Sequence, residues 1–143
     1  SATFFTGDTF GIAYRQLATT RGPFIFPTTT PVQFDPSELH TSIDRLLGHK
    51  PRGMHLTHYG RVDQPEDLGP RLHALIDDFA AMARKAPPGP QRSTHLQDGV
   101  AAIMLNAYHA LGGTLSDVAL RRELAVDVEL NAQGLEVWLD QSR

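Results

Sequence analysis

A short segment, Pro87-Pro88-Gly89-Pro90, constrains the fold of this chain more than any other feature. Proline lacks the backbone N–H that helices and central strands use, so three prolines around a glycine exclude both kinds of element. Patterns of strands and helices alternate before the segment, whereas only helical patterns follow it. The sequence therefore predicts an α/β part at residues 1–86, a Pro-rich linker at 87–92 and a helical extension at 93–143.

Two helices are predicted before the linker. Asp35 is a good N-cap, proline suits the first helical position, and apolar residues then recur on one face, so we expect a helix from Pro36 to about Leu47. A longer amphipathic pattern predicts a second helix from about Glu66 to Ala86.

About three helices are predicted in the extension. They cover residues 94–111, residues 114–125 with a capping box of Thr114 and Asp117, and a segment that starts near Asp127 or Asn131. The last two resemble a helix-turn-helix, but residues 114–143 carry six acidic side chains against three arginines, which would repel phosphates. We therefore expect the extension to cover a substrate site or to form a homodimer interface.

Two predicted strands each end at a candidate metal ligand. The first, an apolar segment from Ala2 to Thr6, ends on Gly7 and presents Asp8, and the second, Gly53 to Thr57, is followed by His58. The glycine- and proline-rich residues 10–34 between them predict a long irregular excursion with a short strand at residues 24–26. A carboxylate and an imidazole at strand ends are suitable ligands for zinc or iron.

Composition limits the classes of partner. The chain has 143 residues, 41% of them hydrophobic, a net charge of −3 and no cysteine. The length suits one domain, the charge gives no support to a nucleic-acid partner, and thiolate-ligated zinc is excluded. No apolar run reaches the roughly 18 residues of a membrane span and no signal peptide is visible, so we expect a cytoplasmic protein. Because the chain begins without methionine in a strand-like segment, we expect it to be part of a longer protein.

The order of these segments resembles the second half of the metallo-β-lactamase fold. The resemblance covers about residues 2–86 and rests on Gly7-Asp8, the Pro/Thr-rich excursion, the helix, and the strand that ends in Thr57-His58-Tyr59-Gly60. It implies the second half of an αββα sandwich that holds one or two metals at the edge of its sheets. In that family the residue matching Asp8 bridges both metals and the one matching His58 binds the second. Thr57 stands where the family often has glycine, and the first-half motif His-x-His-x-Asp-His is absent.

The resemblance implies a fragment of a metal-dependent hydrolase. The complete enzyme would use a metal-activated hydroxide to hydrolyse an ester, thioester, lactone or related bond in a small-molecule substrate. Two zinc ions would bind once the missing N-terminal half supplies the other ligands, so the isolated chain is expected to be inactive. Iron stays open as the metal, because Asp8-Thr9-Phe10-Gly11 is similar to the Asp-x-Phe-Gly of the oxygen-sensing and flavo-diiron branch.

Simpler interpretations exist for the same residues. Asp8 also suits a turn after a strand, and a lone histidine such as His58 commonly makes ordinary hydrogen bonds. The alternative function is a non-catalytic α/β binding or assembly module, which unchanged metal content in an Asp8→Ala/His58→Ala variant would favour.

Further residues could serve a substrate pocket. Thr28, Thr29, Thr30 and Tyr59 are candidates for its lining, and Arg15, Arg21 or Tyr59 could orient a substrate anion, although a solvent-exposed excursion accounts for them equally well.

The other histidines are expected to have ordinary structural roles. His55 lies on the strand at an odd offset from His58 and would project to the opposite face. His109 is expected at the edge of the core. The remaining four are predicted to be solvated: His40, His49, His73 and His95.

Overall fold

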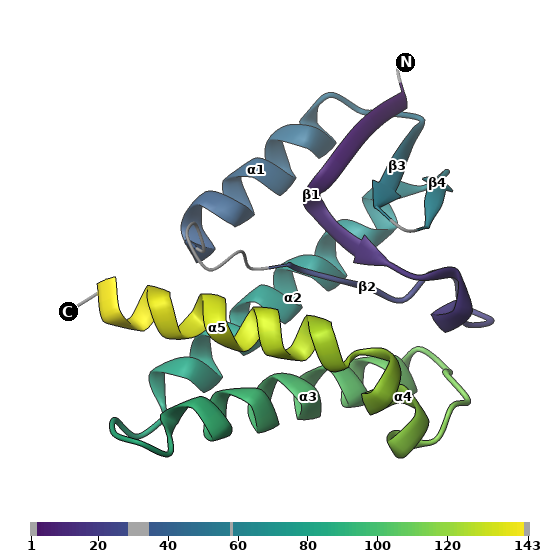
Figure 1. Ribbon diagram of the computed structural model, residues 1–143. Coiled ribbons are helices and arrows are strands. Elements are labelled where there is room, and N and C mark those ends of the chain that lie inside the picture. Colours follow the sequence, from purple (N-terminus) through teal and green to yellow (C-terminus); the bar gives the residue numbers. More distant parts are fainter. Residues whose placement is uncertain (1–2, 29–34, 58, 142–143) are drawn as a thin grey trace.

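The computed structural model of the protein describes residues 3–28, 35–57 and 59–141, with side chains described from Gly11 onward except at Thr57. Within these residues the chain forms one four-stranded sheet, five α-helices and one turn of 3-10 helix (Figure 1). In chain order the elements are β1 (Thr3–Ala13), η1 (Arg15–Leu17), β2 (Ile25–Phe26), α1 (Pro36–Gly48), β3 (Gly53–Thr57), β4 (Gly60–Val62), α2 (Pro65–Arg84), α3 (Arg92–Ala110), α4 (Asp117–Glu123) and α5 (Ala125–Gln141).

The sheet has the strand order β2-β1-β3-β4. β1 is parallel to β3, and α1 lies on the connection between them, whereas β2 and β4 pair antiparallel at the two edges. The register of β1 against β3 is irregular, since Gly7 pairs with Leu56 but the next pair joins Ile12 to Thr57. β1 therefore changes partner along its length, and its last residues pair with β2.

The predicted strand end at Gly7 is wrong. β1 continues to Ala13, so the backbone of Asp8 lies inside the strand and not after it. The reason is that Ile12 and Ala13 find an antiparallel partner in β2, which comes from the excursion. The sequence of the first residues alone does not show this pairing, because the partner strand β2 comes later in the chain.

The predicted αββα sandwich is also wrong. The described residues form a single small sheet beside five helices, and its edge strands β2 and β4 have two and three residues. The apolar faces of α2, α3 and α5 pack mainly on one another, so they do not form a helical layer over a second sheet. The chain thus has an α/β segment joined to a larger helical part.

The predicted helices are confirmed, with small shifts at their ends. Asp35 caps α1 as expected, because its carboxylate accepts a hydrogen bond of 3.2 Å from the backbone N–H of Glu38. The cap of α4 differs from the prediction. Ser116, and not Thr114, accepts from the backbone N–H of Ala119 at 3.2 Å.

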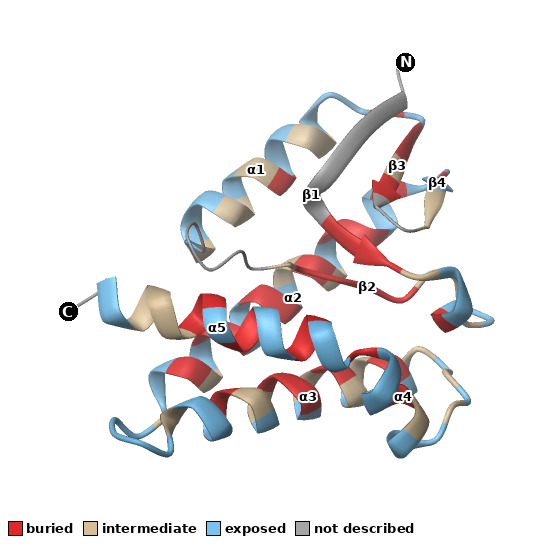
Figure 2. Ribbon diagram, viewed as in Figure 1, coloured by how far each residue is buried: buried red, intermediate tan, exposed pale blue. Residues whose placement is uncertain are grey.

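α2 is the central helix of the molecule. It packs against α1, α3, α5 and β2, and Figure 2 shows the buried faces of the helices turned toward it. Leu72, Ile76 and Phe79 of α2 are fully buried in a core that also includes Met104 of α3 and Leu135 of α5. One core therefore runs through residues on both sides of the Pro-rich segment, and the predicted division into two domains stays a prediction.

Side chains next to β1 and β2 contact the C-terminal helices. The Tyr14 hydroxyl, just after β1, donates to the carboxylate of Asp127 in α5, with oxygen separations of 2.9 and 3.0 Å. The ring of Phe24 meets that of Tyr108 in α3 edge to face, with centroids 5.5 Å apart. Among the described helices, none is both long and apolar enough to cross a membrane.

Candidate ligand-binding site

The predicted metal ligands are not tested by the structure. The side chain of Asp8 and the whole of His58 lie outside the described residues, as do Thr29 and Thr30. Among the residues that are described, no group of three or more His, Asp and Glu side chains could hold a metal ion.

The other predicted pocket residues have separate surroundings. Tyr59 is half-buried, and the guanidinium of Arg15 lies over its ring, 5.0 Å from the centroid. Thr28 is half-buried after β2. Arg21 donates from Nη1 to the backbone carbonyl of Ala110 at 3.1 Å, which ties the excursion to the end of α3. Thr28 and Tyr59 line neither of the two cavities that follow.

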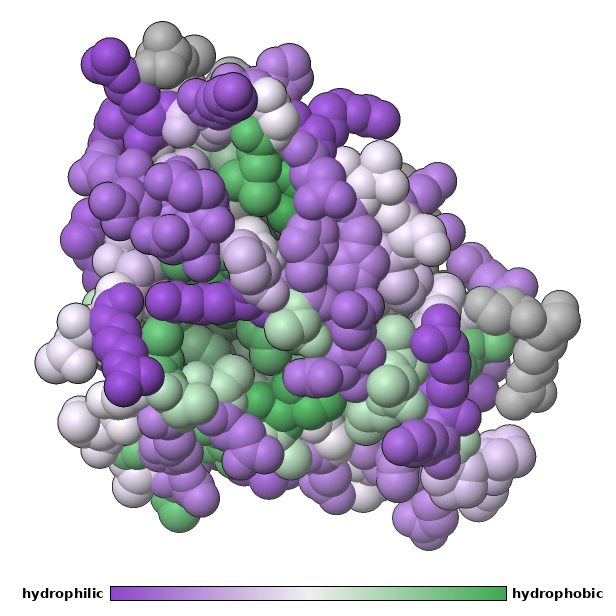
Figure 3. All heavy atoms as spheres, turned by 180° about the vertical axis from the view of Figure 1, so that it is seen from behind, coloured by the Kyte–Doolittle hydropathy of each residue, from purple (hydrophilic) through white to green (hydrophobic). Residues whose placement is uncertain are grey.

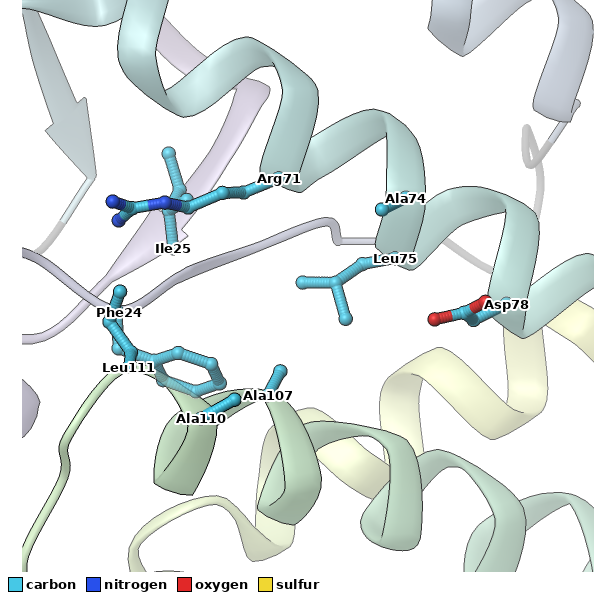
Figure 4. Close-up of a pocket in the computed structure, with 9 residues that line it drawn as sticks. All are labelled: Phe24, Ile25, Arg71, Ala74, Leu75, Asp78, Ala107, Ala110 and Leu111. Carbon is cyan, nitrogen blue, oxygen red and sulfur yellow. The ribbon is translucent and has the colours of Figure 1, made fainter.

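An apolar cavity of about 290 Å³ lies between α2, α3 and the start of β2 (Figure 4). Its walls come mainly from aliphatic and aromatic side chains, and small alanines on both helices leave the space open. Seen from behind, the molecule shows hydrophobic surface set between hydrophilic side chains (Figure 3). The lining residues are Phe24, Ile25, Arg71, Ala74, Leu75, Asp78, Ala107, Ala110 and Leu111.

Arg71 is the polar residue of interest in this cavity. Its Nη1 atom is buried and has no hydrogen-bond partner among the described residues. α2 places it one turn before Leu75, so its stem runs beside the apolar stripe while its guanidinium lies at one end of the cavity (Figure 4). A buried cationic donor without a partner is unfavourable unless an acceptor reaches it.

A second, more polar cavity of about 270 Å³ begins at the same guanidinium, because Arg71 lines both. Arg21, Asp63 and Asp67 contribute charged groups to it. The Asp63 carboxylate is already paired with Arg61 Nε at 2.6 Å. Arg71 therefore stands between an apolar compartment and a polar one.

The opposite end of the apolar cavity carries a negative charge. Asp78 is exposed and lies seven residues after Arg71 on α2, which is about 10 Å along a helix axis. The two groups do not point toward each other in Figure 4. The cavity thus has a cationic end, an apolar middle and an acidic rim.

Sequence reasoning missed Arg71, and the available signal is weak. Leu68, Leu72 and Leu75 mark the buried face of α2, and Arg71 lies next to Leu68 and Leu75 on the helix surface. A charged residue beside an apolar stripe usually extends into solvent, so the pattern alone gives no reason to single it out. The cavity itself depends on Phe24 and Ala107, which are distant in sequence.

Comparison of the chain with protein-family models, curated proteins and solved structures finds no match. The resemblance to the metallo-β-lactamase fold therefore rests on the quoted residues alone, and none of these comparisons identifies that fold.

Proposed function

We propose that this chain binds a small organic acid with an apolar body in the cavity between α2, α3 and β2. The observation that carries the proposal is the buried, unpartnered Nη1 of Arg71 at the wall of an apolar cavity. Concave apolar sites with a few placed polar groups are the usual form of small-molecule sites.

The chemistry of Arg71 favours a carboxylate as the bound group. A guanidinium presents its N–H groups in a planar fork that matches the two oxygens of a carboxylate. Leaving a buried charged donor unpaired costs about 1–3 kcal/mol or more, and the ligand would remove that cost when it binds.

The cavity sets the size of the ligand body. Its volume of about 290 Å³ lies just below the usual range of small-molecule sites, about 300–1,000 Å³, which favours a small ligand. The apolar middle of the cavity, between Arg71 and the rim at Asp78, suits a medium-chain carboxylate such as octanoate. A hydroxyl or amino group at the far end of the ligand would add a hydrogen bond to Asp78.

This proposal is close to the alternative function expected from the sequence, a non-catalytic α/β binding or assembly module. The hydrolase hypothesis was derived from the resemblance to a sandwich that the chain does not form, and it stays untested. Zinc or iron at Asp8 and His58, a missing N-terminal half, a homodimer through α3 to α5 and a cytoplasmic location also stay predictions.

Calorimetric titration with octanoate tests the proposal. We expect saturable binding of one octanoate per chain and an affinity at least about tenfold lower in Arg71→Gln, because the charge-assisted hydrogen bond is lost. Arg122→Gln is the matched control, since Arg122 is an exposed arginine of α4 that does not line the cavity, and it should bind like the unmodified chain. Octanamide, which has the same chain without the negative charge, should bind much more weakly.

A second variant separates the apolar contribution from the charge. Ala107→Leu fills the middle of the cavity while Arg71 stays in place, so octanoate binding should be lost. Without ligand, Arg71→Leu should raise the free energy of unfolding by about 1 kcal/mol, because a buried unpaired donor is removed. Equal octanoate affinities in Arg71→Gln and the unmodified chain would contradict the proposal.

A further inference from the structure

Two histidines that were expected to be solvated face each other between α1 and α2. The Nδ1 atoms of His40 in α1 and His73 in α2 are 2.5 Å apart, and the rings are stacked with centroids separated by 4.7 Å. Each ring is also held from its other nitrogen. His40 Nε2 lies 2.8 Å from Asp77 of α2, and His73 Nε2 lies 2.8 Å from Asp44 of α1.

The four residues form a symmetric arrangement from one repeated spacing. In each helix an aspartate follows the histidine by four residues, so both lie on the same face, and each histidine pairs with the aspartate of the opposite helix. The expectation of solvated histidines is therefore wrong for His40 and His73, since each exposes about a quarter of its side chain (26%). The repeated His-x-x-x-Asp was the sequence signal that could have found them.

The carboxylates determine which nitrogen of each ring carries its first hydrogen. An ionised aspartate only accepts hydrogen bonds, so Nε2 of each ring must be the donor. Nδ1 of a neutral ring is then an acceptor, and two neutral rings would bring two lone pairs together at 2.5 Å. One additional proton on either Nδ1 turns this repulsive contact into a charge-assisted hydrogen bond, which is the short and strong kind.

We propose that His40 and His73 share a single proton between their Nδ1 atoms, and that this proton makes the contact between α1 and α2 sensitive to pH. In acid, a second proton would set two N–H donors against each other on two positively charged rings. In alkali, loss of the shared proton would leave two lone pairs face to face. The contact is therefore strongest when the pair holds one proton, and it weakens toward either extreme of pH.

The charges around the rings favour one extra proton. The two carboxylates on the Nε2 atoms carry −2 and the shared proton adds +1, so the cluster keeps a net charge of −1. β1 packs against α1 and β2 against α2, and their described side chains are uncharged. α3 and α5 also pack on α2, and several of their charged groups pair with residues other than the two rings: Arg92 with Glu136 and Asp140, Asp98 with Arg121, His109 with Asp117, and Asp127 with Tyr14.

The shared proton joins two parts of the fold. α1 lies on the connection between β1 and β3, whereas α2 is the central helix of the core. The helices approach closely beside the histidines because Gly69 of α2 lacks a side chain, and a Cβ at that position would lie 2.5 Å from Leu47 Cδ1 of α1. A change in proton number at the pair therefore acts on the attachment of α1 to the rest of the molecule.

The chain offers a matched control histidine. His109 in α3 is also partly exposed and has Asp117 at 2.7 Å from Nε2, but its Nδ1 faces the backbone carbonyl of Gly113 at 3.4 Å and not a second imidazole. It shares the carboxylate–histidine pairing without the two converging nitrogens. Its protonation is thus independent of another ring.

Nitrogen NMR of the imidazole rings tests the shared proton directly. Near neutral pH we expect a hydrogen on both Nε2 atoms and one further proton shared by the Nδ1 atoms of His40 and His73. During a pH titration the two rings should change together in two steps, because the groups are coupled. His109 should titrate in one step, and so should His73 in His40→Gln.

Thermal unfolding between about pH 5 and about pH 9 tests the effect on the fold. At neutral pH, His40→Gln should unfold about 3 °C or more below the unmodified chain, and the difference should shrink toward both acid and alkali. The difference between the unmodified chain and His109→Gln should instead change with pH in one direction only. Circular dichroism at neutral pH checks that each variant folds.

An aspartate variant separates the two arms of this dependence. In Asp44→Asn the amide can donate to Nε2 of His73, so that ring can carry its hydrogen on Nδ1 and donate it to His40 without an extra proton. The weakening in alkali should therefore disappear in Asp44→Asn, whereas the weakening in acid should remain.

Three outcomes would overturn the proposal. The first is a neutral pair near pH 7, with the hydrogen of one ring on Nδ1 in place of Nε2. The second is independent, single-step titration of His40 and His73. The third is a stability difference between the unmodified chain and His40→Gln that does not change with pH. None of them bears on the octanoate site, which involves different residues of α2.

Discussion

The helical part and the sheet part of this molecule are built on different kinds of contact. In α2, buried residues recur every three or four positions, so one short segment contains the whole apolar face that meets α3 and α5. In the sheet, β2 and β4 are two and three residues long and β1 pairs irregularly with β3. Local spacing thus specifies the helices, whereas the sheet depends on partners far along the chain.

The difference indicates that the helical part supports the sheet. A small sheet gains stability when one face packs on helices, and here β2 packs against α2 while Phe24 contacts Tyr108 of α3. The reverse dependence is weaker, because most of the core of α2, α3 and α5 comes from those helices themselves.

The largest expected effect comes from Phe79→Ala in α2. Phe79 is fully buried, so its truncation should lower the free energy of unfolding by about 3–5 kcal/mol in urea denaturation. Leu130→Ala, at a residue that is 41% exposed in α5, should cost less than about 1 kcal/mol. If the sheet depends on the helices, amide hydrogen exchange in Phe79→Ala should become faster in β3 as much as in α3. Unchanged exchange in β3 would contradict this dependence.

A smaller effect is expected from Gly11→Ala at the end of β1. Gly11 has φ of +84°, and a Cβ there would lie 2.6 Å from the Phe26 carbonyl oxygen, so we expect a loss of about 2–3 kcal/mol. Gly22→Ala is the control, because Gly22 also has positive φ but nothing lies within 4 Å of its Cβ position. It should cost about 1 kcal/mol from the backbone alone. Equal losses of unfolding free energy in Gly11→Ala and Gly22→Ala would show that the contact of the new Cβ with β2 contributes little to the destabilisation.

The smallest expected effect concerns the α3–α4 connection, at the edge of the helical part. The hydrogen bond to Asp117, and then that to the Gly113 carbonyl, raise the pKa of His109 above its usual value. In Asp117→Asn, NMR titration should find a lower pKa for His109, whereas Asp98→Asn, which removes a pairing with Arg121, should leave it unchanged.

The raised pKa of His109 determines how the stability contributed by its pairing with Asp117 changes with pH. The stabilisation from the charged pair is fully present below the unfolded-state pKa and is lost as pH rises through the higher folded-state pKa. The stability difference between the unmodified chain and Asp117→Asn should therefore be larger near pH 6 than near pH 8. A difference that grows with pH would contradict this pairing.

Elements encoded by neighbouring residues could be predicted from the sequence. Asp35 and Pro36 fix the start of α1, and the apolar spacing gives α2 and α3 to within two or three residues. β3 was predicted with its observed bounds, Gly53–Thr57. In each case the decisive interactions lie within one turn or one strand.

Features that depend on distant residues could not be predicted in this way. The continuation of β1 beyond Gly7 depends on β2, and the cavity at Arg71 depends on Phe24 and Ala107 from other elements. The pairing of His40 with His73 requires α1 and α2 to lie side by side at Gly69. A single sequence does not show which of these segments lie next to one another in the folded chain.

The hydrogen bond between Tyr14 and Asp127 has a consequence for how the chain is made. Its partners are 113 residues apart, and at 5–20 residues per second a ribosome needs roughly 6–23 s to produce the second after the first. β3 and α2 are synthesised within that interval, but the end of β1 lacks its link to α5 until the interval ends. The final attachment of the sheet is therefore a late event in biosynthesis, and a nascent chain stalled before Asp127 should be more sensitive to protease near Tyr14 than the completed one.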